Sequence, residues 1–210
     1  MTIRPDELSS ADVATAGGDR VGIILGLTPA WPGASLAGRA FTVAGASGDN
    51  LALHRALADA APGSILVVAL SGESPAGHWG EIMCVAASAA GIKGLIIAGT
   101  VRDVARIAAL RFPVFHVGFG PRPATKSNPG QLGHSIRIRG TEISPGDLVV
   151  ADVDGIAIVP HQIVDQVLAD VDDLQRREAN LIRLLEQGVT TLEALEIDPL
   201  GGEHPSATPG

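Results

Sequence analysis

Two short apolar runs, each with helix-like segments beside it, constrain the fold of this chain more than any other feature. SILVVAL at 64–70 and IKGLIIA at 92–98 have the length of strands that are buried on both faces. Amphipathic segments typical of helices surround them, at 50–61, 81–90 and 103–111. The alternation of strand and helix predicts an α/β fold whose first half contains a parallel sheet.

The second half of the chain has a different pattern. Its short strand-like runs, within 134–160, are separated by Pro145-Gly146-Asp147 and by Asp154-Gly155. Asp-Gly between two apolar runs is typical of a tight hairpin, because glycine readily takes the positive φ that such a turn needs. We therefore expect antiparallel hairpins here and, with the first half, a mixed sheet in a compact layered sandwich.

A long amphipathic helix is predicted at 162–187, ending at Gly188. Its apolar residues at helical spacing are Ile163, Val167, Val171, Leu174, Leu181 and Leu185. Two interpretations of this apolar stripe stay open. It packs on the chain's own sheet, or it reaches a neighbouring subunit.

Composition limits the class of protein. The 210 residues are 46% hydrophobic, which predicts one globular domain at 1–197 with a mobile tail at 198–210. The net charge of −8 argues against a nucleic-acid partner, because binding to phosphates needs clustered Lys and Arg. No apolar run is long enough to span a bilayer and the first residues lack a signal-peptide core, so we expect a cytoplasmic protein without membrane contact. Cys84, the one cysteine, is expected on a buried helix face with no chemical role.

The stretch LIIAGTVRD at 95–103 indicates a candidate site, because Arg102 and Asp103 stand side by side where a strand is followed by a helix. The first amides of the preceding helix, at 81–83, have no partner within that helix and form a potential anion site. Arg102 can clamp the same anion with two hydrogen bonds. Asp103 is an oxygen ligand suited to Mg²⁺.

Other interpretations of these residues stay open. Asp103 is well placed to cap the helix that follows it, and Arg102 could pair with a surface carboxylate. Asp49 is a candidate cap of the helix at 50–61. His54 and His78 are further candidates for proton transfer, although a lone histidine is more often structural.

Three segments carry a resemblance to a known family. They are GDNLALHRAL at 48–57, GHWGEIMCVAASAAGIKGLIIAGTVRDVARIAALRFPVFHVG at 77–118 and ISPGDLVVADVDGIAIVP at 143–160. Over about 37–160, the chain resembles the family that contains class II 4-hydroxy-4-methyl-2-oxoglutarate aldolases and the regulator of ribonuclease activity A. The resemblance implies a swivelling-domain-like fold, assembled as a homotrimer or hexamer with sites at subunit interfaces.

The resemblance also implies the parts of an active site. Asp103 would hold a divalent metal, Mg²⁺ or Mn²⁺, and Arg102 would hold the carboxylate of a small 2-oxo acid. Glu178 of the long helix would reach a neighbour's site, as a third catalytic residue beside Arg102 and Asp103. The substrate-binding positions that the resemblance implies are Gly80, Glu81, Ile82, Met83 and Arg102.

The reaction implied by the aldolase branch is cleavage of a 2-oxo-4-hydroxy acid to release pyruvate. Decarboxylation of oxaloacetate would proceed through the same enolate, with the metal as a Lewis acid on the 2-oxo group. The other branch implies a non-catalytic regulator that binds another protein.

Two positions depart from the aldolase pattern. Aldolases of the family commonly carry Asp-Gly before the Arg-Asp pair and an acidic residue three positions after it, where this chain has Ala98-Gly99 and Arg106. Loss of an acid that supports a metal ligand typically costs about 10- to 100-fold in metal affinity or activity. Arg106 lies one helical turn from Asp103, where it could pair with that carboxylate and compete with a cation.

Overall fold

The computed structural model describes residues 8–198. The strands are β1 (Gly22–Ile24), β2 (Thr28–Pro29), β3 (Leu36–Ala46), β4 (Ser64–Ser71), β5 (Ala76–Gly77), β6 (Gly94–Val101), β7 (Val114–Phe119), β8 (Arg122–Pro123), β9 (Gln131–Leu132), β10 (Ile136–Ile138), β11 (Thr141–Ile143), β12 (Leu148–Ala151) and β13 (Ile156–Val159). The helices are α1 (Ser10–Gly17), α2 (Leu51–Asp59), α3 (Glu81–Ala89), α4 (Val104–Leu110), α5 (Val164–Glu186) and α6 (Thr191–Ala194), with short 3₁₀ turns at Gly18–Arg20 and His161–Ile163.

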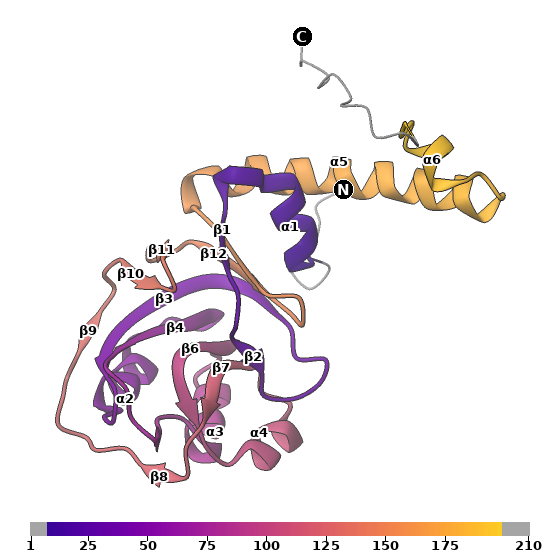
Figure 1. Cartoon of the computed structure of the whole chain (residues 1–210). Coiled ribbons are helices and arrows are strands. Elements are labelled where there is room, and N and C mark those ends of the chain that lie inside the picture. Colours follow the sequence, from indigo (N-terminus) through magenta and orange to yellow (C-terminus); the bar gives the residue numbers. More distant parts are fainter. Residues whose placement is uncertain (1–7, 199–210) are drawn as a thin grey trace.

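One mixed sheet organises the molecule, in the order β1-β13-β12-β3-β4-β6-β7-β2, with β9 also paired to β3 (Figure 1). Strands β3, β4, β6 and β7 are parallel to one another, and the remaining pairs of this sheet are antiparallel. The predicted α/β fold with a mixed sheet and a long C-terminal helix is therefore confirmed.

The boundaries of one strand differ from the prediction. Strand β6 continues past the predicted end at Ala98, through Gly99, to Val101. Its pairing with β7 shifts register between Ile97 and Thr100, and this irregularity lets the strand continue beyond the glycine. The Arg-Asp pair therefore begins directly after the strand.

Three apolar clusters hold the layers together. Helices α2, α3 and α4 cover one face of the parallel strands, and their cluster includes Cys84 and Trp79 (Figure 1). A second cluster lies on the other face and includes residues of β10 to β13, while a third joins α1 and α5 to β12 and β13. The Cys84 Sγ accepts a hydrogen bond from Trp79 Nε1 at 3.0 Å, and burial raises the pKa of this thiol to about 11, as expected of a structural cysteine.

Helix α5 is only partly packed on its own chain. Its buried residues are Val164, Val167 and Val171, all in its first third, and α1 lies against it. The rest of the helix extends away from the sheet (Figure 1). Within residues 8–198 no helix is both long and apolar enough to cross a membrane. Of the tail predicted at 198–210, residues 199–210 lie outside the described part of the chain.

Candidate active site

The corner after β6 brings the Arg-Asp pair to the start of α3. The backbone N–H of Arg102 donates to the carbonyl of Trp79 at 2.8 Å, which ties the corner to the segment that leads into α3. Asp103 then takes the left-handed conformation, with φ 58°, as the last residue before α4. Non-glycine residues rarely adopt this conformation, and where they do it is often at a functional site.

The Asp103 carboxylate does not cap its own helix. It makes no capping hydrogen bond in α4; instead its Oδ2 accepts the N–H of Glu81, the first residue of α3, at 3.3 Å. Arg102 Nε lies 3.5 Å from the same oxygen. Asp103 therefore occupies the N-cap position of α4, but its side chain accepts from the first residue of α3, at the positive end of that helix dipole. Arg102 pairs with a partly exposed carboxylate, that of Asp103 itself.

This arrangement uses most of the predicted anion site. The amide of Glu81 is taken by Asp103, and the amide of Met83 donates to the carbonyl of Gly80 at 3.1 Å. Among the described residues, the N–H of Ile82 makes no hydrogen bond. The donors that remain for a substrate carboxylate are thus the Ile82 amide and Arg102, rather than the three amides predicted from the sequence.

Two glycines permit the close approach. A Cβ at Gly80 would lie 2.5 Å from Asp103 Oδ2, and a Cβ at Gly77 would lie 2.6 Å from Arg102 Cβ and 2.4 Å from the carbonyl of Gly120. Real Cβ atoms do not tolerate such distances. At Gly77 the clash would be with backbone, so only glycine fits there, whereas at Gly80 the Asp103 carboxylate would have to move.

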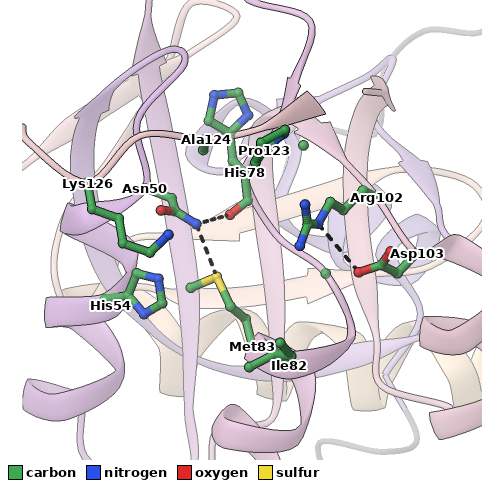
Figure 2. A pocket seen from close by; sticks show the side chains of 12 residues that line it. Asn50, His54, His78, Ile82, Met83, Arg102, Asp103, Pro123, Ala124 and Lys126 are labelled. Atoms are coloured by element: carbon green, nitrogen blue, oxygen red, sulfur yellow. Dashed lines mark hydrogen bonds and ion pairs between the residues drawn. The ribbon is translucent and has the colours of Figure 1, made fainter. Parts of the chain in front are cut away.

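These residues line one small pocket of about 210 Å³ (Figure 2). Of the predicted site residues, it is lined by Gly80, Ile82, Met83, Arg102 and Asp103. Glu81 is not among the lining residues. Figure 2 shows Arg102 and Asp103 at one end of the pocket and Lys126 with His54 at the other. The pocket therefore presents a cationic group at each end, which suits a small acid with two carboxylates.

Sequence reasoning missed Asn50 and Lys126. Asn50 is buried and donates through Nδ2 to the carbonyl of His78 at 3.0 Å, while its Oδ1 is buried without a hydrogen bond from the described residues. Such unsatisfied buried acceptors are uncommon in folded proteins. Asn50 follows Asp49 in a segment that already resembled the family, so it could have been found there. Lys126 lies in a long polar loop with no pattern of its own.

Asp49 anchors the loop that carries Lys126. Its Oδ2 accepts hydrogen bonds from Thr125 Oγ1 at 2.6 Å and from the N and Oγ of Ser127 at 2.6 and 2.9 Å. Asn50, not Asp49, is the N-cap residue of α2, but Asp49 Oδ1 accepts the N–H of Leu51, the first residue of the helix, at 2.9 Å. Burial by itself would raise the pKa of Asp49, but these hydrogen bonds outweigh it and hold the pKa well below its usual range.

His78 is a structural histidine. Its Nε2 accepts the N–H of Gly48 at 2.7 Å, so the hydrogen is on Nδ1, which faces the carbonyl of Thr100 at 3.1 Å. Burial lowers the pKa of His78 and favours this neutral form. Both ring nitrogens are occupied, which leaves none for proton transfer.

His54 lines the pocket, and neither of its ring nitrogens makes a hydrogen bond to another described residue. Its Nε2 is buried without a hydrogen bond from the described residues, and burial together with the charge of Lys126 lowers its pKa. Within this pocket His54 is therefore the histidine that could contact a ligand.

Arg106 pairs with Glu81, not with Asp103. Its Nη1 donates to Glu81 Oε2 at 2.6 Å across the first turns of α4 and α3. The pairing with Asp103 suggested by the sequence is thus wrong, although Arg106 still lies within electrostatic range of that carboxylate.

The remaining predicted positions lie elsewhere. Ala98 lines a second, wider cavity of about 620 Å³, whose lining includes neither Arg102 nor Asp103. Within one chain, its side chain is therefore not placed to support Asp103. Glu178 is exposed on the part of α5 that extends away from the sheet and does not line the pocket of its own chain. Its predicted role concerns a neighbour's site and stays a prediction.

Comparisons with known proteins agree with this architecture. The RraA-like family, described as Aldolase/RraA, matches residues 10–158. A protein of Halalkalibacterium halodurans named "Putative 4-hydroxy-4-methyl-2-oxoglutarate aldolase" is 32% identical over 157 residues, which cover 75% of each chain.

Two solved structures are similar over most of their length. A protein from Pseudomonas syringae pv. tomato has a TM-score of 0.82 at 29% identity, covering 92% of this chain and 91% of that one. Streptomyces coelicolor RraAS2, described as an unusual member of the RNase ES inhibitor RraA protein family, has a TM-score of 0.72 at 27% identity, covering 82% and 90%. The family model matches most of this chain, and the two solved structures have the same fold. The chain therefore belongs to the RraA-like family, which includes both aldolases and ribonuclease inhibitors.

Proposed function

We propose that this protein is a divalent-metal-dependent lyase that cleaves a 2-oxo-4-hydroxy acid and releases pyruvate, with oxaloacetate decarboxylation as a second reaction. One observation carries the proposal. Arg102, Asp103 and Ile82, whose N–H makes no hydrogen bond to the described residues, line the same small pocket, although they come from two different segments of the chain. The similarity to a protein named as an aldolase supports this reaction class.

The residues present fit Mg²⁺ or Mn²⁺. The Asp103 side chain is 34% exposed, and its Oδ1 accepts no hydrogen bond from the described residues. Those residues contain no cluster of three or more His, Cys, Asp or Glu side chains, which excludes a closed cage of protein ligands within one described chain. Mg²⁺ usually takes one or two carboxylates and completes its shell with water and substrate, as Asp103 would allow. When bound, the metal supplies a Lewis acid for the 2-oxo group.

The chain's own residues then orient the substrate. Arg102 and the Ile82 amide bind the carboxylate next to the 2-oxo group, and Lys126 at the far end attracts the second carboxylate. Because the pocket is small, it restricts the bound substrate to few orientations, and this loss of freedom before the reaction lowers the entropic cost of reaching the transition state.

The proposal includes an assembly. We expect a homotrimer or hexamer in which the exposed part of α5 carries Glu178 to a neighbour's site. The first third of the helix already packs on its own chain. We propose that the remaining part of the apolar stripe packs on a neighbouring subunit.

A non-catalytic regulator that binds another protein is the second candidate. The ion pair between Arg106 and Glu81 favours it, because it neutralises an acid beside Asp103 where an aldolase would gain from a carboxylate. The similarity to RraAS2 points the same way. The unsatisfied oxygen of Asp103 favours the lyase.

Pyruvate release separates the two candidates. Purified protein is incubated with 4-hydroxy-4-methyl-2-oxoglutarate or with oxaloacetate, in Mg²⁺ or Mn²⁺ and then in excess chelator. The lyase proposal expects pyruvate that disappears with chelator and returns when metal is added back. Pyruvate release from both substrates that is no faster with protein than in the same metal solution without it would contradict the proposal and favour the regulator.

A further inference from the structure

The contact between α3 and α4 ties two carboxylates and a guanidinium into one chain of interactions. The backbone N–H of Glu81 donates to Asp103 Oδ2 at 3.3 Å, and the side chain of Glu81 accepts from Arg106 Nη1 at 2.6 Å. Glu81 therefore touches the proposed metal ligand with its backbone while its own carboxylate is held by Arg106.

The ion pair between Arg106 and Glu81 is permanently charged but exposed to water. Arg106 stays protonated at any physiological pH, and the hydrogen bond to Glu81 with the charges of Glu81 and Asp103 raises its pKa further. The ion pair is open to water, with 69% of the Arg106 side chain and 36% of the Glu81 side chain exposed. Exposed pairs of this kind contribute little to stability, so the pair can be broken without unfolding the protein.

We propose that Arg106 keeps the Glu81 carboxylate from serving as a second ligand beside Asp103, and thereby weakens divalent-cation binding at this site. The inference rests on the proposed function, which places the cation at Asp103. A guanidinium and a metal ion compete for the same carboxylate oxygens, and Mg²⁺ or Mn²⁺ gains affinity when a second carboxylate joins the first. Released from Arg106, the Glu81 side chain can rotate about its own bonds toward Asp103, to which its backbone is already joined.

The test measures Mn²⁺ binding to the full chain by calorimetric titration, without substrate and without turnover. Arg106→Ala should tighten Mn²⁺ binding roughly 10-fold. This is the usual size of the effect when a residue that contacts a metal ligand, but not the metal, is replaced. Arg137→Ala is the matched control, because Arg137 forms a similarly exposed ion pair with Glu142 at 2.8 Å in the β10–β11 hairpin. The control should leave Mn²⁺ affinity unchanged.

A double variant separates the loss of a charge from the release of Glu81. Arg106→Ala with Glu81→Gln removes one positive and one negative charge, so the net charge equals that of the parent. The inference expects its Mn²⁺ affinity to fall back to within about twofold of the parent, since no second carboxylate is freed. A double variant that stays as tight as Arg106→Ala, or an Arg106→Ala variant that binds no tighter than the parent, would overturn the inference.

Asp103→Ala distinguishes this failure from failure of the proposed function. If Mn²⁺ binding survives in Asp103→Ala, the cation is not held at Asp103 and the proposed function loses its metal site. If Asp103→Ala abolishes binding while Arg106→Ala changes nothing, the metal site stands and the role of Arg106 alone is wrong.

Discussion

Two aspartates follow parallel strands of this sheet and precede helices, and the protein uses their oxygens differently. Asp49, between β3 and α2, is buried, and both of its oxygens accept hydrogen bonds from Leu51, Thr125 and Ser127. Asp103, between β6 and α4, is partly exposed, and only one of its oxygens accepts a single, long hydrogen bond.

The difference separates a structural carboxylate from an available one. A saturated, buried carboxylate stabilises the fold and has no capacity for a ligand. Asp103 has a left-handed backbone conformation, and one oxygen of its carboxylate makes no hydrogen bond to the described residues, so it stabilises the fold less than Asp49 does. Such locally unfavourable residues are typical of functional sites. The comparison therefore places Asp49 in the scaffold of the pocket and supports the proposed role of Asp103 in binding a ligand.

Asp103→Ala should give the largest effect on activity. Loss of the proposed metal ligand should lower metal-dependent pyruvate release by at least about 100-fold, the cost of removing one group that stabilises a developing oxyanion. The melting temperature should stay close to that of the parent, because the side chain is exposed and makes one long hydrogen bond. Asp59→Ala, an exposed aspartate at the end of α2, is the control for loss of a charge. Full activity in Asp103→Ala would remove the catalytic assignment.

Gly80→Ala sharpens the comparison by moving Asp103 without removing it. The new Cβ would lie 2.5 Å from Asp103 Oδ2, so the carboxylate must shift. Displacement of a reacting group by about 1 Å can cost on the order of 100-fold in rate, and we expect a loss of roughly 10- to 100-fold in kcat/KM. Gly118→Ala is the control, because its Cβ would meet its nearest neighbour, Thr100 Cγ2, at an ordinary 3.6 Å. Equal activities of the two variants would show that the position of Asp103 is unimportant.

The fold was largely predictable from the sequence, since it follows local patterns. The apolar runs of β4 and β6 and the Asp154-Gly155 turn between β12 and β13 specify strand and hairpin from neighbouring residues alone. The Arg102-Asp103 corner was found for the same reason.

The partners of the site residues were not predictable, because they depend on contacts between distant segments. The pairing of Arg106 with Glu81 follows from how α3 and α4 lie against each other, not from the spacing of Arg106 and Asp103 along one helix. Lys126 reaches the pocket because Asp49 anchors its loop from 76 to 78 residues away. Local periodicity contains no information on either contact.

Asp49→Asn tests the structural side of the comparison. The amide would place N–H groups against donors that now face a carboxylate, and we expect a loss of roughly 3 kcal/mol in the free energy of unfolding, with Asp59→Asn as the neutral control.

The stability difference between the parent and Asp49→Asn should also depend on pH, in a direction set by the pKa of Asp49. Because the folded-state pKa of Asp49 is lowered, its stabilisation is fully present above the unfolded pKa near 3.8 and is lost as pH falls toward the folded pKa. The stability advantage of the parent over Asp49→Asn should therefore shrink below about pH 4. An advantage that is constant from pH 7 to pH 3 would contradict the assignment of a hydrogen-bonded carboxylate.

Lys126→Met should give the smallest effect, because the charge it removes is exposed to water. Lys126 is proposed to attract the second carboxylate of the substrate, and an exposed charge acts on binding more than on the chemical step. We expect KM for 4-hydroxy-4-methyl-2-oxoglutarate to rise roughly 10-fold with kcat nearly unchanged, and the rise to shrink as salt is added. Lys93→Met, the same substitution outside the pocket, should leave KM as it is. A fall in kcat with unchanged KM would instead place Lys126 at the reacting atoms, and the two ends of the pocket would have to be reassigned.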